Sequence, residues 1–226
     1  MHLLLIRHGE TDWNNEGRLQ GHTDILLNAR GIEQARILSM RLAAEENIQT
    51  IYSSPLSRAR VTAEIIGDIF HLHPIMDERL MERNAGHLEG LTAGEVKTRF
   101  PEFFKVWHGP RDQPLQLPGG EDDLAFQKRV ASFLQTLQDE QRDRSIAVVT
   151  HGGTLAMIIA TLLGLNLNHR LPFRFDNTSL NVVDFTDGRL CLKRLNDTFH
   201  LRNGYAASSQ DKLLRPVSLG TELETQ

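Results

Sequence analysis

The first strong pattern in the sequence is an apolar run, Leu3–Ile6, that stops abruptly at Arg7, His8 and Gly9. Because the run is continuous rather than alternating, it predicts a strand buried on both faces, as in a parallel sheet. In open α/β sheets, ligands bind at the loops that follow the carboxyl ends of such strands. Arginine binds phosphate or carboxylate through two nitrogens, and histidine can carry a proton or attack as a nucleophile. The run therefore predicts a parallel sheet with Arg7 and His8 at its ligand-binding edge.

Five more segments have the composition of short strands: Thr50–Tyr52, Pro74–Met76, Ser145–Thr150, Asn181–Phe185 and Leu190–Leu195. The last two are joined through an Asp-Gly pair, which is typical of tight turns, and so predict an antiparallel hairpin at the edge of the sheet. Amphipathic helical patterns separate the other strands. This alternation predicts an α/β fold of three layers, with a mostly parallel central sheet and helices on both of its faces.

Two helix starts can be placed from their capping residues. Asn28 is an expected N-cap, and Ser54 with Pro55 after it predicts a second helix start. The face of this second helix that we expect to be buried carries Val61, Ile65, Ile66 and Ile69. The proline-rich segment Phe103–Glu121 is expected to be a loop.

We expect residues 1–203 to form one domain, with a lid-like excursion over 91–121 and a mobile tail over 204–226. The excursion carries basic side chains that acidic ones offset, so its charge is nearly neutral. The residues after Asn203 lack hydrophobic periodicity, which is typical of a mobile terminus.

Composition limits the classes of function. The 226 residues are 40% hydrophobic and 24% charged, as in an ordinary globular chain. A formal net charge of -4 argues against nucleic acid or an acidic membrane surface as the partner. The single cysteine, Cys191, excludes an intrachain disulfide. No signal peptide or membrane span is predicted, so we expect a cytoplasmic protein.

Three more polar residues recur near the expected strand ends. Arg58 lies in the first turn of a helix, where amide N–H groups also favour anions, and His151 follows a buried strand and precedes two glycines. Glu82 lies in an irregular polar segment. Each of the three, taken alone, is more typical of a solvated or structural side chain. Together with Arg7 and His8, however, they supply two arginines for a phosphoryl group, an imidazole to attack phosphorus and an acid to protonate a departing alkoxide.

A series of motifs runs through most of the chain in a definite order: Leu5–Thr11 with Asn14, Leu19–Gly21, Leu27–Ala35, Ser53–Ala63, Glu82–Gly90, Pro118–Glu121 and Val149–Gly153. Each motif is weak by itself, whereas the ordered series is highly specific. In these motifs the sequence resembles the histidine phosphatase superfamily, which includes cofactor-dependent phosphoglycerate mutase and many small phosphatases.

The resemblance implies a role for each matching residue. It implies that His8 is the nucleophile and becomes phosphohistidine, and that Glu82 acts as the general acid and then as the base that activates water. It implies that Arg7, Arg58 and His151 hold the phosphoryl oxygens. The residues that it places at the substrate are Arg7, Asn14, Gln20, Gly21, Arg58, His151 and Gly152. It implies no metal ion and no other cofactor.

The function that follows is a metal-independent phosphomonoesterase, which hydrolyses a small phosphorylated metabolite. The alternative within the family is a cofactor-dependent phosphoglycerate mutase. Against it stand the nearly neutral excursion and Ala85, where many relatives have an aromatic residue. Two remote alternatives are a non-haem iron enzyme with His8, Glu10 and His151 as ligands, and a non-catalytic phosphate-binding module. The identity of the substrate stays open, as does a homodimer.

Overall fold

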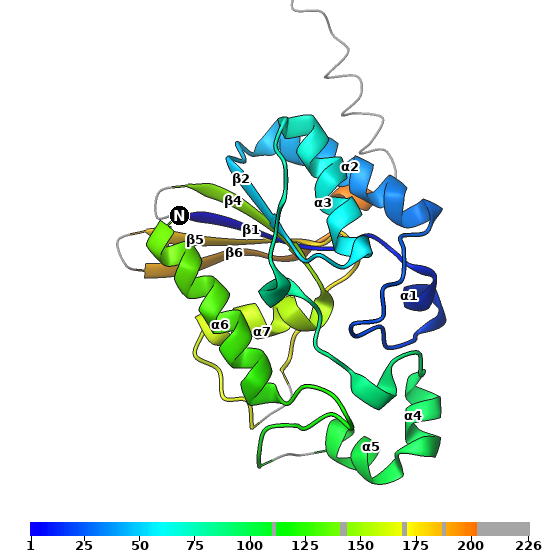
Figure 1. Cartoon of the computed structure of the whole chain (residues 1–226). Coiled ribbons are helices and arrows are strands. Elements are labelled where there is room, and N and C mark those ends of the chain that lie inside the picture. The colour runs from blue at the N-terminus through cyan, green and yellow to red at the C-terminus, as the bar shows by residue number, and fades with distance from the viewer. Residues whose placement is uncertain (110–111, 141–143, 169–170, 187–188, 203–226) are drawn as a thin grey trace, which may run out of the picture.

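The computed structural model describes residues 1–109, 112–140, 144–168, 171–186 and 189–202. A six-stranded sheet with the order β3-β2-β4-β1-β5-β6 forms its centre (Figure 1). The strands are β1 His2–Arg7, β2 Thr50–Ser53, β3 Ile75–Met76, β4 Ser145–Thr150, β5 Leu180–Thr186 and β6 Arg189–Asp197. Strands β1 to β4 are parallel, whereas β5 runs antiparallel to both β1 and β6. The predicted mostly parallel sheet with an antiparallel edge pair is confirmed; the expected hairpin turn and the tail over 204–226 lie outside the described residues.

Helices cover both faces of the sheet, as predicted. Helices α2 and α3 lie on one face and α6 and α7 on the other, while α4 and α5 lie beyond the layers (Figure 1). The helices are α1 Asp12–Glu16, α2 Ala29–Glu45, α3 Ser57–Phe70, α4 Ala93–Arg99, α5 Pro101–His108, α6 Asp123–Glu140 and α7 Gly152–Leu162.

The two faces of β1 explain why its apolar run is continuous. Leu4 and Ile6 belong to the hydrophobic cluster beneath α2 and α3. Leu3 and Leu5 belong to the cluster beneath α6 and α7, where Phe133 is the bulkiest hydrophobic side chain among those almost fully buried. Because successive side chains of a strand point to opposite faces, a strand covered on both sides must be apolar at every position.

The segment 91–121 is more helical than the sequence analysis predicted. The expectation of a loop is wrong over Phe103–His108, because α5 begins with Pro101 at its first turn, where a proline needs no hydrogen-bond partner for its nitrogen. The aromatic residues of this region recur at helical spacing and pack against a third hydrophobic cluster. They are Phe100, Phe103, Phe104 and Trp107.

The start and the buried face of α3 also differ from the prediction. The helix begins at Ser57, and Asp24 caps it from another segment: its carboxylate accepts from the Ser57 backbone nitrogen and from Ser57 Oγ, both at 2.7 Å. Of the four residues expected to be buried, Ile66 is fully buried and Ile69 is 45% exposed. Ala59 and Ala63 take the other core positions, because the helix packs closely on the sheet. The predicted cap of α2 is confirmed, since Asn28 Oδ1 accepts from the Gly31 nitrogen at 2.8 Å.

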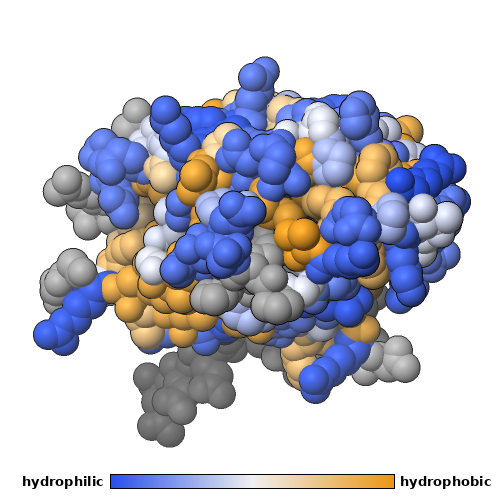
Figure 2. Space-filling view, turned by 90° about the horizontal axis from the view of Figure 1, so that it is seen from below, coloured by the Kyte–Doolittle hydropathy of each residue, from blue (hydrophilic) through white to orange (hydrophobic). Residues whose placement is uncertain are grey.

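The described surface is mainly polar. Figure 2 shows hydrophilic residues over most of one face, with hydrophobic residues gathered in smaller patches between them. Cys191 on β6 is an exposed free thiol. No helix among the described residues combines the length and the hydrophobicity needed to cross a bilayer.

The contrast between Ile66 and Ile69 gives a matched test of the packing of α3. We expect Ile66→Ala to lower the free energy of unfolding by about 2–5 kcal/mol, because it removes methyl groups from a closed core. Ile69→Ala removes the same atoms from a half-exposed site and should cost less than about 1 kcal/mol. Urea denaturation of both variants measures the difference, and equal losses would contradict the described helix orientation.

Candidate active site

A cavity of about 550 Å³ lies where β1, α3 and the start of α7 come together. Every site residue predicted from the sequence lines it, except His151. The lining residues from that prediction are Arg7, His8, Asn14, Gln20, Gly21, Arg58, Glu82 and Gly152. The tertiary structure therefore brings together residues that are up to 145 positions apart in the chain, from Arg7 to Gly152.

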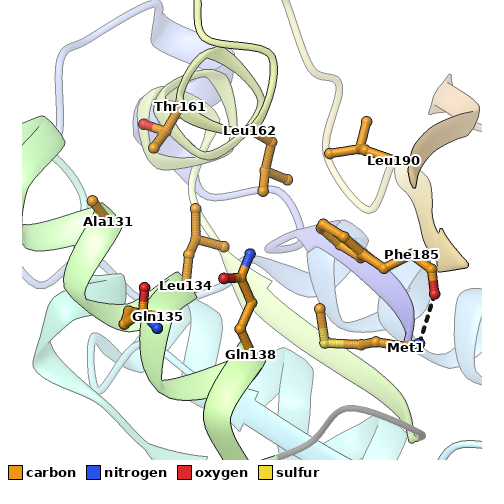
Figure 3. A pocket seen from close by; sticks show the side chains of 9 residues that line it. All are labelled: Met1, Ala131, Leu134, Gln135, Gln138, Thr161, Leu162, Phe185 and Leu190. Carbon is orange, nitrogen blue, oxygen red and sulfur yellow. Dashed lines mark hydrogen bonds between the residues drawn. The ribbon is translucent and has the colours of Figure 1, made fainter. Parts of the chain in front are cut away.

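A second cavity, of about 660 Å³, lies between α6, α7 and the β5–β6 pair (Figure 3). Its walls combine apolar side chains with the amides of Gln135 and Gln138 and the hydroxyl of Thr161. None of the predicted site residues lines it, so the candidate active site is the cavity around His8.

The His8 ring is buried and held in one tautomer. Its Nδ1 lies 2.6 Å from the carbonyl oxygen of Gly9. Since a carbonyl oxygen can only accept, Nδ1 carries the proton and Nε2 keeps its lone pair. Burial, followed by the positive charges of Arg7 and Arg58, lowers the pKa of His8 well below its usual value. The ring is therefore neutral at physiological pH and presents an unprotonated nitrogen, as a nucleophile requires.

The guanidinium of Arg58 is completely buried. It donates from Nη2 to the Gly21 carbonyl at 2.8 Å, from Nη1 to the Thr23 carbonyl at 2.9 Å and from Nε to His151 Nδ1 at 3.2 Å. Burial lowers the pKa of Arg58 to about 10, so the group remains a cation at neutral pH. A guanidinium has five N–H bonds, and those not used by the protein remain for a ligand.

Arg7 supplies a second cation from the end of β1. Its Nη1 donates to the Phe175 carbonyl at 2.6 Å. Its Nε is buried and has no hydrogen-bond partner among the described residues. Burial lowers the pKa of Arg7. A guanidinium keeps its positive charge in proteins at neutral pH. A buried N–H without an acceptor is unfavourable, so this atom marks a place where an oxygen of a ligand would be stabilised.

His151 lies behind His8 rather than in the cavity wall. The two rings are 5.2 Å apart between centroids. Because Nδ1 accepts from Arg58, Nε2 carries the proton and donates to Ser54 Oγ at 2.8 Å. Burial, followed by the charge of Arg58, lowers the pKa of His151 well below its usual value. Both nitrogens are thus engaged by the protein, and a direct contact between His151 and a phosphoryl oxygen stays a prediction that would require Nε2 to leave Ser54.

Glu82 is held at the N-terminus of α7. Its carboxylate accepts from the backbone nitrogens of Gly153 at 3.0 Å, Thr154 at 3.1 Å and Arg83 at 2.9 Å. A Cβ on residue 153 would lie 2.6 Å from Glu82 Oε1, so the second glycine after His151 is needed for this close approach. The helix start therefore fixes the predicted acid at the wall of the cavity.

Three of the predicted substrate-binding residues, Asn14, Gln20 and Gly21, come from the segment between β1 and α2. Asn14 Oδ1 accepts from Asn177 Nδ2 at 3.1 Å, which leaves the amide nitrogen of Asn14 as its donor toward a ligand. Gln20 is buried, and its Oε1 has no hydrogen-bond partner in the described part of the chain. Gly21 adopts a positive φ of 53°. A side chain there would collide with the carboxylate of Glu89.

Glu89 is a residue whose role the sequence analysis did not predict. Its carboxylate accepts from the backbone nitrogens of His22 at 2.8 Å and Thr23 at 3.0 Å, and from Thr23 Oγ1 at 2.5 Å. The same loop carries the carbonyls that accept from Arg58. Glu89 therefore positions Arg58 indirectly. The signal that could have found it is the recurrence of a carboxylate within the Glu82–Gly90 motif.

The structure does not assemble the ligand set that the non-haem iron alternative needs. The Glu10 carboxylate accepts from Asn28 Nδ2 at 3.1 Å and pairs with Arg30 at 3.4 Å, away from the two histidines. No group of three or more histidine, cysteine, aspartate or glutamate side chains suited to a metal ion occurs among the described residues. The geometry around His8 suits an oxyanion bound by guanidinium groups instead.

The fold and the cavity define an α/β protein with an arginine-lined cavity at the carboxyl ends of its parallel strands. Comparison with known proteins identifies the family. The sequence model of the histidine phosphatase superfamily (branch 1) matches residues 3–198, and the chain belongs to this superfamily.

Several relatives are named for reactions on phosphate esters. Phosphoserine phosphatase 1 of Hydrogenobacter thermophilus is 34% identical, over 90% of this chain and 95% of that protein. Probable phosphoglycerate mutase GpmB of Escherichia coli is 35% identical, over 83% of this chain and 86% of that protein. A solved structure of phosphoserine phosphatase from Entamoeba histolytica in complex with phosphoserine is 33% identical and superimposes with a TM-score of 0.77, covering 89% of this chain and 99% of that one.

The part played by Glu89 can be tested against a second carboxylate of similar surroundings. We expect Glu89→Gln to weaken competitive inhibition by inorganic phosphate and vanadate at least about tenfold, because an amide cannot accept from the Thr23 nitrogen with its NH2 group. Asp197 also accepts from a backbone nitrogen, that of Phe199 at 2.9 Å, and pairs with Arg41 at 2.6 Å, but it does not line the cavity. Asp197→Asn should therefore reduce stability without a comparable change in the inhibition constants. Equal changes in both variants would mean that Glu89 has only a structural role.

Proposed function

We propose that this protein is a metal-independent phosphomonoesterase that forms a phosphohistidine at His8. The observation that carries the proposal is a neutral, buried imidazole with a free Nε2, close to the guanidinium groups of Arg7 and Arg58. A phosphoryl group in transfer spreads negative charge over its oxygens, and donors fixed in advance stabilise that charge. Arg7 and Arg58 are such donors.

The reaction then runs in two steps. In the first, His8 Nε2 attacks phosphorus, the bond between phosphorus and the ester oxygen breaks, and Glu82, which enters the step as the protonated carboxylic acid, gives its proton to the departing oxygen and becomes a carboxylate. In the second, Glu82 takes a proton from water, the hydroxide oxygen attacks phosphorus, and the bond to Nε2 breaks. The products are an alcohol and inorganic phosphate, and both residues return to their starting states.

Phosphoserine is the first substrate to test, because relatives that share about a third of this sequence are named as phosphoserine phosphatases. A mutase must in addition retain a doubly phosphorylated intermediate away from water. The excursion over 91–121 provides little support for this, because Lys105 pairs with Glu102 at 2.8 Å and the Arg18 guanidinium pairs with Glu95 at 3.1 Å. These pairs favour phosphatase activity over mutase activity.

The covalent step predicts a labelled enzyme. We expect the wild-type protein, mixed with a ³²P-labelled monoester and quenched, to retain acid-labile, base-stable phosphate, because a phosphoramidate at His8 has that stability. His8→Ala should retain none and should lose turnover, whereas His73→Ala, which alters an exposed histidine, should behave as the wild type. Labelling that survives in His8→Ala, or that disappears with EDTA, would contradict the proposal.

The same preparation distinguishes a phosphatase from a mutase. With 3-phosphoglycerate and catalytic 2,3-bisphosphoglycerate, the proposal requires release of inorganic phosphate to exceed formation of 2-phosphoglycerate. The reverse order of the two rates would establish the mutase.

The role of Glu82 predicts a dependence on the leaving group. We expect Glu82→Gln to lower kcat about 10²–10⁴-fold for an alkyl phosphate, because the departing alkoxide needs a proton. For p-nitrophenyl phosphate the loss should be at least about tenfold smaller, since nitrophenolate leaves without one. Comparison of the two substrates in one variant checks this, and equal losses would show that Glu82 only binds or positions the substrate.

A further inference from the structure

The cavity around His8 has a strongly positive lining, although the chain as a whole has a formal net charge of -4. Among the described residues, five arginines and one carboxylate, Glu82, line it. The arginines are Arg7, Arg18, Arg58, Arg83 and Arg174. Arg7 and Arg58 are sufficient for the phosphoryl group of a monoester, so the other three arginines need a different explanation.

Two of these three are neutralised by acidic neighbours. Arg18 pairs with Glu16 at 2.6 Å and with Glu95 at 3.1 Å. Arg83 pairs with Asp123 at 2.7 Å. Their charges are therefore largely balanced within the protein, and both side chains serve to hold the segments around the cavity.

Arg174 differs from them because it has no ion-pair partner within the described residues, and its side chain is exposed. The backbone next to it is nevertheless fixed beside the phosphoryl site, since the Phe175 carbonyl accepts from Arg7 Nη1 at 2.6 Å. Phe173 and Phe175 flank it and also line the cavity, with their rings 6.3 Å apart between centroids. Its charge acts on Arg7, whose pKa it lowers after the larger effects of burial, which also lowers it, and of the Glu82 and Asp176 carboxylates, which raise it.

Asp176, the acidic residue nearest to Arg174 in the sequence, does not pair with it. The carboxylate of Asp176 accepts from Asn196 Nδ2 at 2.9 Å and so is directed toward β6. Arg174 is thus a cation at the wall of the cavity, close to the phosphoryl site in the fold and not paired with any carboxylate of the described residues.

We propose that Arg174 binds a carboxylate on the leaving group, so that the preferred substrates are small phosphomonoesters that carry a carboxylate near the ester oxygen. The inference rests on the proposed phosphatase function and names the class of its substrate. One guanidinium matches one carboxylate through two parallel hydrogen bonds. A second phosphate would carry more charge than this single free cation balances.

Two pairs of substrates test the proposal, because the members of each pair differ only in the carboxylate. They are phosphoserine with phosphoethanolamine, and 3-phosphoglycerate with glycerol 3-phosphate. We expect the wild-type kcat/KM to favour the carboxylated member at least about tenfold, a ratio that corresponds to about 1.4 kcal/mol. Arg174→Gln should reduce this ratio to within about twofold, and Arg174→Glu should reverse it. Arg18→Gln, which changes a balanced arginine of the same cavity, should keep the ratio of the wild type.

The outcomes separate this proposal from the function on which it rests. If the wild type hydrolyses p-nitrophenyl phosphate but treats both members of each pair alike, the carboxylate site is wrong and the phosphatase function stands. A ratio that persists in Arg174→Gln also overturns the assignment. If no monoester releases phosphate, the phosphatase function itself fails. A preference for 2,3-bisphosphoglycerate that is lost in Arg174→Gln would show that the second group is a phosphate, against the proposal.

Discussion

The buried guanidinium of Arg58 is the interaction on which the rest of the site depends. A cation removed from water is unfavourable unless acceptors replace its hydration. The carbonyls of Gly21 and Thr23 and the Nδ1 atom of His151 supply them, each within 3.2 Å. Gly21 and Thr23 lie between β1 and α2, and His151 directly precedes α7. The burial of one side chain on α3 therefore fixes these three segments of the chain relative to one another.

The same charge contributes to the protonation of the two histidines. Burial has the largest effect, and together with Arg7 and Arg58 it keeps His8 and His151 neutral by lowering the pKa of each ring. A hydrogen bond then selects the tautomer of each ring: His8 donates through Nδ1, and His151 accepts there. The chemical difference between a ring with a free nitrogen and a ring with both nitrogens engaged follows from these partners and not from the residue type.

Carboxylates occupy the helix N-termini that face the site. Asp24 accepts from the first residue of α3, and Glu82 accepts from the first turn of α7. Such N-termini commonly bind the anion of a ligand. Here the helix starts position protein carboxylates, and the guanidinium groups of Arg7 and Arg58 line the cavity.

The sequence alone determined the strands, the covered faces of the sheet and which polar residues lie at the strand ends. The apolar runs before Arg7 and before His151 were sufficient for this, because a strand buried on both faces is apolar at nearly every position. No pattern in the sequence predicted which side chains of distant segments contact one another. The capping of α3 by Asp24, the exposure of Ile69 and the withdrawal of His151 behind His8 depend on packing between helices and loops. The tertiary structure alone also decided which arginines are balanced, because an ion pair between Arg83 and Asp123 joins residues that are far apart in the chain and adjacent only once it is folded.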